Sequence, residues 1–185
     1  MNDDQIISRI IHGDKSIFDE LFVQLYDVLC QYSFSIVKSE HEAEDIVQEV
    51  FINLWSGRSK LDIQTNLRAY LYRSVRNQSI DALRKKATRN NIIEQIAQSD
   101  NAEYKISYVH PSESVDDEIK RLSILVANEA EKLPDRCREI YFLKHRDGLT
   151  IIEISEILDL SQKTVEMRLR DALIILRNKL RGRII

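Results

Sequence analysis

The side chains best suited to chemistry lie near the C-terminal end of the 185-residue chain, where residues 149–176 read LTIIEISEILDLSQKTVEMRLRDALIIL. Thr150 and Glu153 have the spacing of a capping box, which predicts the start of a helix. Ser161 can cap a second helix after a tight turn at Asp159. Two short helices joined in this way, the second longer and basic, are typical of a helix-turn-helix.

This motif would insert its second helix into the major groove of DNA with the N-terminal end first. Gln and Arg side chains read base edges through paired hydrogen bonds, whereas Lys and Thr suit phosphates. The predicted DNA contacts lie on or beside the outward face near that end, and they are Gln162, Lys163, Thr164, Met167, Arg168 and Arg170.

An ordinary helical hairpin is an alternative interpretation of the same pattern. The turn carries Asp159 where such motifs usually place Gly, although Asp tolerates the left-handed backbone better than most residues. Glu166 and Asp171 put negative charge on the second helix. If Arg168 turns back to pair with Glu153 or Asp171, its contact with DNA is lost.

Positive charge is concentrated in two separate blocks, although the net charge of the whole chain is −3. Residues 61–90 carry 7 Lys and Arg against 2 Asp and Glu, and residues 134–185 carry 11 against 8. Residues 1–60 and 91–133 are acidic. Contact with a polyanion is therefore expected to be local and in two parts.

The elements that would position these residues are helical. Only 4 Gly and 2 Pro occur, which argues against an all-β fold with its many turns. Residues 57–66 are expected to form a loop and residues 91–114 a linker, with one short helix near 92–97. Apolar residues at helical spacing predict helices in the C-terminal motif and over residues 17–37, 40–55, 67–88, 115–133 and 134–145. The sequence therefore predicts an all-α chain of two small helical domains.

Details of individual helices follow from the same spacing. Asp14 or Ser16 caps the helix over residues 17–37, and Ser39 with Glu42 forms a capping box at the start of the next helix. The buried face of that helix is predicted to consist of Ala43, Ile46, Val47, Val50, Phe51 and Leu54. In the last helix the buried stripe contains either Ala172 or Leu173.

Catalytic, metal-binding and membrane proteins are disfavoured by the composition. The four histidines are scattered, no glycine-rich phosphate loop occurs, and Cys30 and Cys137 lack neighbours at metal-ligand spacing. We therefore expect no catalysis, no metal and no cofactor. The acidic N-terminus is unlike a signal peptide and no apolar run has membrane length, so a cytoplasmic protein without membrane insertion is expected.

Three segments occur in a characteristic order along the chain, and they read HEAEDIVQEVFINLW, NLRAYLYRSVRNQSIDALRKK and LPDRCREIYFLKHRDGLTIIEISEILDLSQKTVEMRLRDALIILR. In this order they resemble the extracytoplasmic-function (ECF) sigma factors of the sigma-70 family of bacterial RNA polymerase. The resemblance implies a region 2-like domain over residues 1–90, a linker over 91–114 and a region 4-like helix-turn-helix domain over 115–185. It also implies a promoter-specificity subunit that binds core RNA polymerase, recognises the −35 and −10 promoter elements and assists promoter melting.

The family's roles fall on matching residues of this sequence. The acidic second helix would dock on the coiled coil of the polymerase β′ subunit through Asp45, Gln48, Glu49 and Asn53. Strand opening at the −10 element needs a pocket for a flipped base and a basic track for the displaced strand. The candidates for this role are Lys60, Asn66, Arg68, Tyr72, Arg73, Arg76, Asn77 and Arg84. The C-terminal helix would read the −35 element, with Arg168 and Arg170 as its main contacts.

Plainer interpretations compete with these roles. The acidic face and the arginines can be solvated helix surfaces, and Tyr70 and Tyr72 can pack in the core instead of stacking on bases. For the whole chain, one alternative is a helix-turn-helix transcriptional regulator that acts without direct core polymerase binding. Another is a helical adaptor that binds protein only, whose affinity for its partner shows none of the salt dependence of DNA binding. The resemblance further implies an anti-sigma partner, which the residues do not identify.

Overall fold

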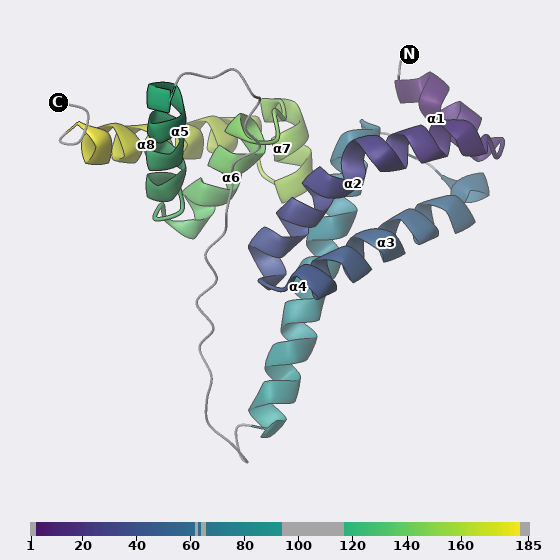
Figure 1. Ribbon diagram of the computed structural model, residues 1–185. Coiled ribbons are helices and arrows are strands. Elements are labelled where there is room, and N and C mark those ends of the chain that lie inside the picture. Colours follow the sequence, from purple (N-terminus) through teal and green to yellow (C-terminus); the bar gives the residue numbers. More distant parts are fainter. Residues whose placement is uncertain (1–2, 62, 64–65, 94–116, 182–185) are drawn as a thin grey trace. The chain divides into compact units, whose positions relative to one another are not determined.

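The computed structural model describes residues 3–61, 63, 66–93 and 117–181 (Figure 1). Within these residues the chain forms eight α-helices and one short 3-10 helix, and it contains no strand. The expected all-α fold class is confirmed. The described helices fall into two separate compact units, each with its own core, one before residue 102 and one after residue 103.

The first unit contains four of the helices. They are α1 (Asp3–Ile11), α2 (Lys15–Val37), α3 (Glu40–Ser56) and α4 (Leu67–Ile93), with the 3-10 helix η1 (Arg58–Lys60) between α3 and α4. Sequence analysis missed α1, which buries Ile7 and Ile10 on one face and turns into α2 through Gly13 at a φ of 81°. Three long helices, α2, α3 and α4, pack against one another to form the core (Figure 1).

Side-chain caps set where these helices begin. Asp14, rather than Ser16, is the N-cap of α2 and accepts hydrogen bonds from the backbone N–H groups of Ser16 and Ile17. The Ser39 hydroxyl caps α3 by accepting from the N–H of Glu42. The Glu42 carboxylate also lies 3.3 Å from the Lys86 Nζ, so the same residue joins α3 to α4.

The core of the first unit confirms the predicted face of α3. All six apolar residues expected on that face are buried: Ala43, Ile46, Val47, Val50, Phe51 and Leu54. Each of the five larger side chains, those other than Ala43, stabilises the fold by about 1.5–3 kcal/mol when it is fully removed from water. The rings of Tyr32 and Tyr72 add a buried aromatic contact between α2 and α4, with centroids 5.1 Å apart.

Helix α4 is longer than its sequence pattern predicted, because it continues to Ile93 and so includes the first residues of the expected linker. Its start is held twice. The Asn66 side-chain oxygen accepts hydrogen bonds from the N–H groups of Arg68 and Ala69, and the Asp3 carboxylate accepts from the N–H of Leu67 at 3.2 Å. The rest of the linker expected up to residue 114 lies outside the described residues.

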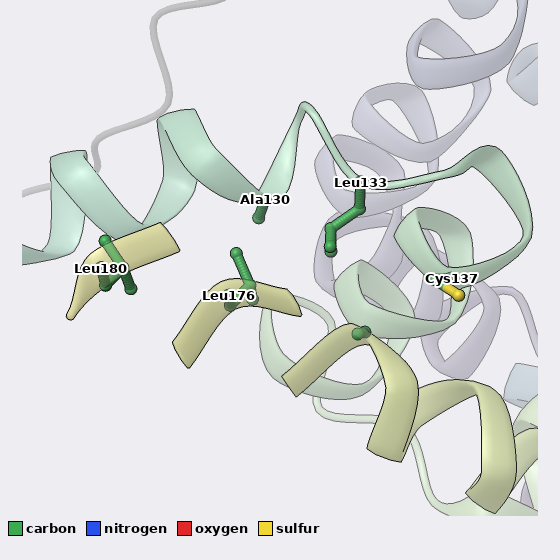
Figure 2. Packing of buried hydrophobic residues seen from close by; sticks show 6 residues of the cluster. Ala130, Leu133, Cys137, Leu176 and Leu180 are labelled. Carbon is green, nitrogen blue, oxygen red and sulfur yellow. The ribbon is translucent and has the colours of Figure 1, made fainter. Parts of the chain in front are cut away.

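The second unit consists of α5 (Asp117–Ala130), α6 (Asp135–His145), α7 (Ile151–Leu158) and α8 (Gln162–Leu180). Pro134 occupies the N-cap position of α6, where its missing N–H has no cost. Figure 2 shows part of the core, with Ala130 and Leu133 on one side and Leu176 and Leu180 of α8 on the other. Helices α7 and α8 are the helix-turn-helix that the sequence predicted.

Candidate nucleic-acid interface

The first helix of the helix-turn-helix begins with the capping box expected from sequence. The Thr150 N–H donates to the Glu153 carboxylate at 2.7 Å, and the Glu153 N–H donates to the Thr150 hydroxyl at 3.2 Å. The same carboxylate oxygen also accepts from the Thr150 hydroxyl at 2.8 Å. Glu153 is therefore committed to the start of α7.

The turn between α7 and α8 is tight and depends on two polar residues. Asp159 adopts the left-handed conformation with φ 53° and ψ 50°, the conformation for which Gly is usually chosen. Ser161 then caps α8 by accepting from the Thr164 N–H at 3.1 Å. Because the two hydroxyls also lie 2.8 Å apart, the Thr164 side chain takes part in the cap.

Helix α8 separates an apolar face from a polar one. Val165, Ala172 and Leu176 are buried, and the open choice between Ala172 and Leu173 is settled because Leu173 is 45% exposed. Of the six predicted DNA contacts, Thr164 and Arg168 are half-buried. The remaining four are exposed in the N-terminal half of the helix: Gln162, Lys163, Met167 and Arg170.

Arg168 is half-buried in the second unit. Burial, as the largest effect, and the charge of Asp171 raise the pKa of the Cys137 thiol on α6, while the charge of Arg168 lowers it. Among the described residues, Arg168 forms no ion pair with Glu153 or Asp171, so the competing pair considered from sequence does not form. Of the two arginines, Arg170 is the more exposed candidate.

A second basic surface lies on α4 and η1 in the first unit. Six of the eight residues expected there keep part or all of their side-chain surface in solvent. Arg68 and Arg76 are half-buried, while Lys60, Asn66, Arg73 and Asn77 are exposed. Arg84 is exposed and forms an ion pair with Asp81 at 3.2 Å, one turn earlier on the same helix.

The structure contradicts the base-stacking role expected of Tyr72, the last of the eight residues. Its side chain is 0% exposed and its ring packs against Tyr32, so it presents no face on which a base could stack. The Arg68 guanidinium carbon lies 5.8 Å from the centre of the Tyr72 ring. Tyr72 is a core residue, whereas Tyr70 is half-buried and keeps part of its surface in solvent.

The acidic surface of the first unit lies on α3. Asp45, Gln48, Glu49 and Asn53 are all exposed on one side of this helix. The Asp45 carboxylate pairs with His41 at 2.9 Å, and Gln48 donates to the Tyr26 hydroxyl of α2 at 3.3 Å. The four residues predicted to bind polymerase thus share one surface.

Sequence analysis missed an apolar groove next to this acidic surface. The groove has a volume of about 380 Å³ and is lined by Phe18, Phe22, Gln48, Phe51, Ile52, Trp55 and Ser56 of α2 and α3. Ile52 is 61% exposed beside it, which is unusual for so large an apolar side chain. Phe18 and Phe22, one helical turn apart, belong to the apolar pattern that predicts this helix, but the pattern does not show that both are only half-buried.

The described residues contain no cluster of His, Cys, Asp or Glu side chains that could hold a metal ion. Cys30 and Cys137 are free thiols. Among the helices of the described ranges, none has both the length and the apolar character that crossing a membrane requires.

Comparison with known families assigns both units to one class of protein. Residues 21–89 match the model for sigma-70 region 2, and residues 125–176 match the model for sigma-70 region 4. The first match covers α3 and nearly all of α4, and the second covers the helix-turn-helix.

Individual relatives extend this assignment over nearly the whole chain. The chain is 30% identical over 177 residues to the ECF RNA polymerase sigma factor SigW of Bacillus subtilis, covering 95% of each protein. It is 27% identical to SigM of the same organism, covering 87% of this chain and 95% of SigM. The chain therefore belongs to the ECF sigma factor family, and its function is that of a sigma subunit in transcription initiation.

Solved structures agree with this fold. CnrH, solved in complex with the cytosolic domain of CnrY, has a TM-score of 0.64 at 22% identity, with 98% of each chain covered. The sigma factor RpoE of Bartonella quintana, solved with the anti-sigma factor NepR, has a TM-score of 0.63 at 19% identity, with 89% of this chain and 96% of RpoE covered. The family and fold class predicted from the sequence are confirmed.

Proposed function

We propose that this chain binds core RNA polymerase as its promoter-specificity subunit, recognises the −35 and −10 promoter elements and assists promoter melting. The observation that carries the proposal is that the two basic surfaces belong to separate units. One lies on α4 within sigma-70 region 2 and the other on α8 within region 4. The polymerase performs the chemistry, so this role requires no catalytic group or cofactor in the chain.

The −35 element is assigned to the N-terminal end of α8. Its exposed side chains combine Gln162 and Arg170, which can read base edges, with Lys163, which can contact phosphate. Met167 supplies an apolar surface suited to a thymine methyl group. Arg168 and Thr164 are assigned to the flank of the contact, since both are half-buried.

The −10 element is assigned to α4 and η1. Arg73, Asn77 and Arg84 are exposed along one helix, which suits a basic track for single-stranded DNA. Lys60 and Asn66 are exposed where the chain enters α4, and Arg68 and Arg76 are half-buried beside them. Tyr70, in place of Tyr72, is the tyrosine assigned to base stacking.

Core polymerase is assigned to the acidic surface of α3, with the β′ coiled coil as its partner. Asp45 and Glu49 can pair with basic side chains, and the adjoining apolar groove can receive an apolar side chain from the same partner helix. Apolar burial supplies affinity, while the charges select the partner and its orientation.

The acidic net charge of −3 fits a protein that contacts DNA effectively only within the polymerase. Each basic surface offers few contacts by itself. Placing both on one scaffold raises the effective concentration for the second contact, with a gain in avidity on the order of 10²–10⁴. We further propose an anti-sigma factor as a partner, because RpoE, of similar fold, was solved with the anti-sigma factor NepR. We propose the cytoplasm as location, because CnrH, also of similar fold, was solved with the cytosolic domain of CnrY.

The test is to mix the purified chain with core RNA polymerase, isolate the complex by gel filtration and transcribe genomic fragments. The variant Asp45→Lys/Glu49→Lys should lose the complex, because it places positive charge against a basic partner. Glu20→Lys is the matched control, since Glu20 is an exposed acid on α2. Tight binding to duplex DNA alone, without affinity for core polymerase, would support a helix-turn-helix regulator instead.

A further inference from the structure

Trp55 is the only tryptophan of the chain and lies in the last turn of α3. Its ring packs against Phe18 of α2 with centroids 4.8 Å apart, and it lines the apolar groove between these helices. The chain then turns through Gly57 into η1, the short helix that precedes α4. Trp55 therefore lies at the junction between the groove and the segment assigned to the −10 element.

Arg58, the first residue of η1, closes over this tryptophan. Its guanidinium carbon lies 4.4 Å from the centre of the Trp55 ring, and its Nη1 donates to the Trp55 carbonyl at 2.7 Å. The Arg58 side chain also passes the turn before α2, where its Nε would lie 3.7 Å from a Cβ added to Gly13. Arg58 is half-buried, whereas Lys60 at the other end of η1 is exposed.

The Arg58 guanidinium is held in place by two interactions with Trp55, one with its ring and one with its carbonyl. A cation over an aromatic ring is attracted by the ring's negative face, and the hydrogen bond to the carbonyl fixes the orientation of the planar group. An arginine held in this way is poorly placed to follow a DNA phosphate. It does, however, determine the direction in which η1 leaves α3.

We propose that Arg58 is a positioning residue, which stacks on Trp55 to orient η1 and thereby presents Lys60 to promoter DNA. The inference rests on the proposed function, and it gives the two basic residues at the ends of η1 different roles. Arg58 acts through Trp55, and Lys60 touches the DNA.

Salt dependence of promoter binding by the holoenzyme separates the two roles. The probe is a promoter fragment selected by transcription of genomic DNA. Each phosphate contact contributes about 0.9 to the slope of log affinity against log salt. Lys60→Ala should reduce the magnitude of the slope by about one. Arg58→Ala should weaken promoter binding about threefold to tenfold and should reduce the slope by no more than Lys60→Ala does, because it acts through the Lys60 contact. In the Lys60→Ala background, Arg58→Ala should change neither the affinity nor the slope. A further loss in that background, or unaltered promoter affinity of the single Arg58→Ala variant, would overturn the proposal.

Fluorescence of Trp55 provides a second measurement on the free, full-length chain. Arg58→Ala should increase acrylamide quenching and shift the emission, because one face of the ring loses its cover. Arg58→Lys should recover part of both the quenching and the promoter affinity, and it serves as the readout if the alanine variant does not fold. Quenching identical in wild type and Arg58→Ala would overturn the contact. Failure of the wild-type chain to bind core polymerase would refute the proposed function but leave this fluorescence result valid.

Discussion

The hydroxyl oxygens of Ser33 and Ser79 lie 2.9 Å apart, and both side chains are completely buried between α2 and α4. A buried hydroxyl needs a partner, because water cannot reach it. Each serine therefore supplies the hydrogen-bond partner that allows the other to be buried. This pair joins the helix that carries the basic surface to the rest of the first unit.

A double-mutant cycle should reveal this dependence. Ser79→Ala leaves the Ser33 hydroxyl unsatisfied and should lower the free energy of unfolding by about 1–3 kcal/mol. Ser33→Ala should have a similar effect. The double variant should lose less than the sum of the two, because it removes both polar groups. Urea unfolding measures all four proteins, and strictly additive losses would contradict the pairing.

The Thr150 cap should stabilise the second unit. Thr150→Ala removes the hydroxyl that accepts from Glu153, and should destabilise that unit by about 0.5–2 kcal/mol. Thr150→Ser retains the hydroxyl and is the matched control. Thermal unfolding followed by circular dichroism measures the difference. Equal stability of the alanine and serine variants would show that the cap contributes nothing.

Asp14 should make the stability of the first unit depend on pH in the acidic range. The Arg9 side chain, which donates a hydrogen bond to Asp14 at 2.8 Å, is the main cause that lowers the pKa of this carboxyl below 3.8. The stabilisation is fully present above that ordinary pKa, and it is lost as the pH falls through the lowered folded-state pKa. Asp14→Asn can still cap α2 but cannot titrate. Its urea midpoint should therefore fall less between pH 6 and pH 2 than that of the wild type, and parallel curves would contradict this assignment.

Cys30 should react slowly with alkylating reagents. Burial, as the largest effect, raises the pKa of its thiol to about 11, and only the thiolate is nucleophilic. At pH 8 about one molecule in a thousand would carry the thiolate. The rate of iodoacetamide labelling, measured on the Cys137→Ala variant, should therefore keep rising beyond pH 10. A plateau below pH 9 would be inconsistent with a raised pKa.

The exposure of Arg170 and the partial burial of Arg168 predict unequal effects on promoters that depend on the −35 element. Arg170→Ala should cost about 1–3 kcal/mol of binding if it removes a base contact. Arg168→Ala should also lower activity, but less. Arg177→Ala, on the same helix but farther from its N-terminus, is the matched control. Transcription in vitro at such a promoter measures all three, and a larger loss for Arg168→Ala would reverse the assignment.

Local patterns of the sequence were sufficient to predict several features of the fold. The six buried residues of α3 and the capping box of Thr150 with Glu153 depend on spacings of four residues or fewer. The left-handed conformation of Asp159 depends on the backbone of a single residue. Helix α1 is different, because Ile6, Ile7, Ile10 and Ile11 do recur at helical spacing. Its nine residues are shorter than the stretch over which such a period is normally judged.

Features that depend on neighbouring helices could not be predicted in this way. A tyrosine at the edge of a buried stripe can point either way, and only the position of Tyr32 on α2 places Tyr72 in the core. Arg168 is likewise half-buried while Arg170, two residues later, is exposed, a difference that depends on the packing around α8. The apolar groove exists only where Phe18 and Phe22 meet α3, which no single helix pattern encodes.

The hydrogen bond between Asp3 and Leu67 spans 64 residues, and this separation bears on how the chain folds during synthesis. Helices α1, α2 and α3 leave the ribosome first, at roughly 5–20 residues per second, and their shared apolar surface stays uncovered until α4 follows. The paired helices α2 and α3 are close in sequence and can associate early. Helix α4 then closes the structure, so translational pausing just before Leu67 would prolong the interval in which chaperones can bind the nascent chain.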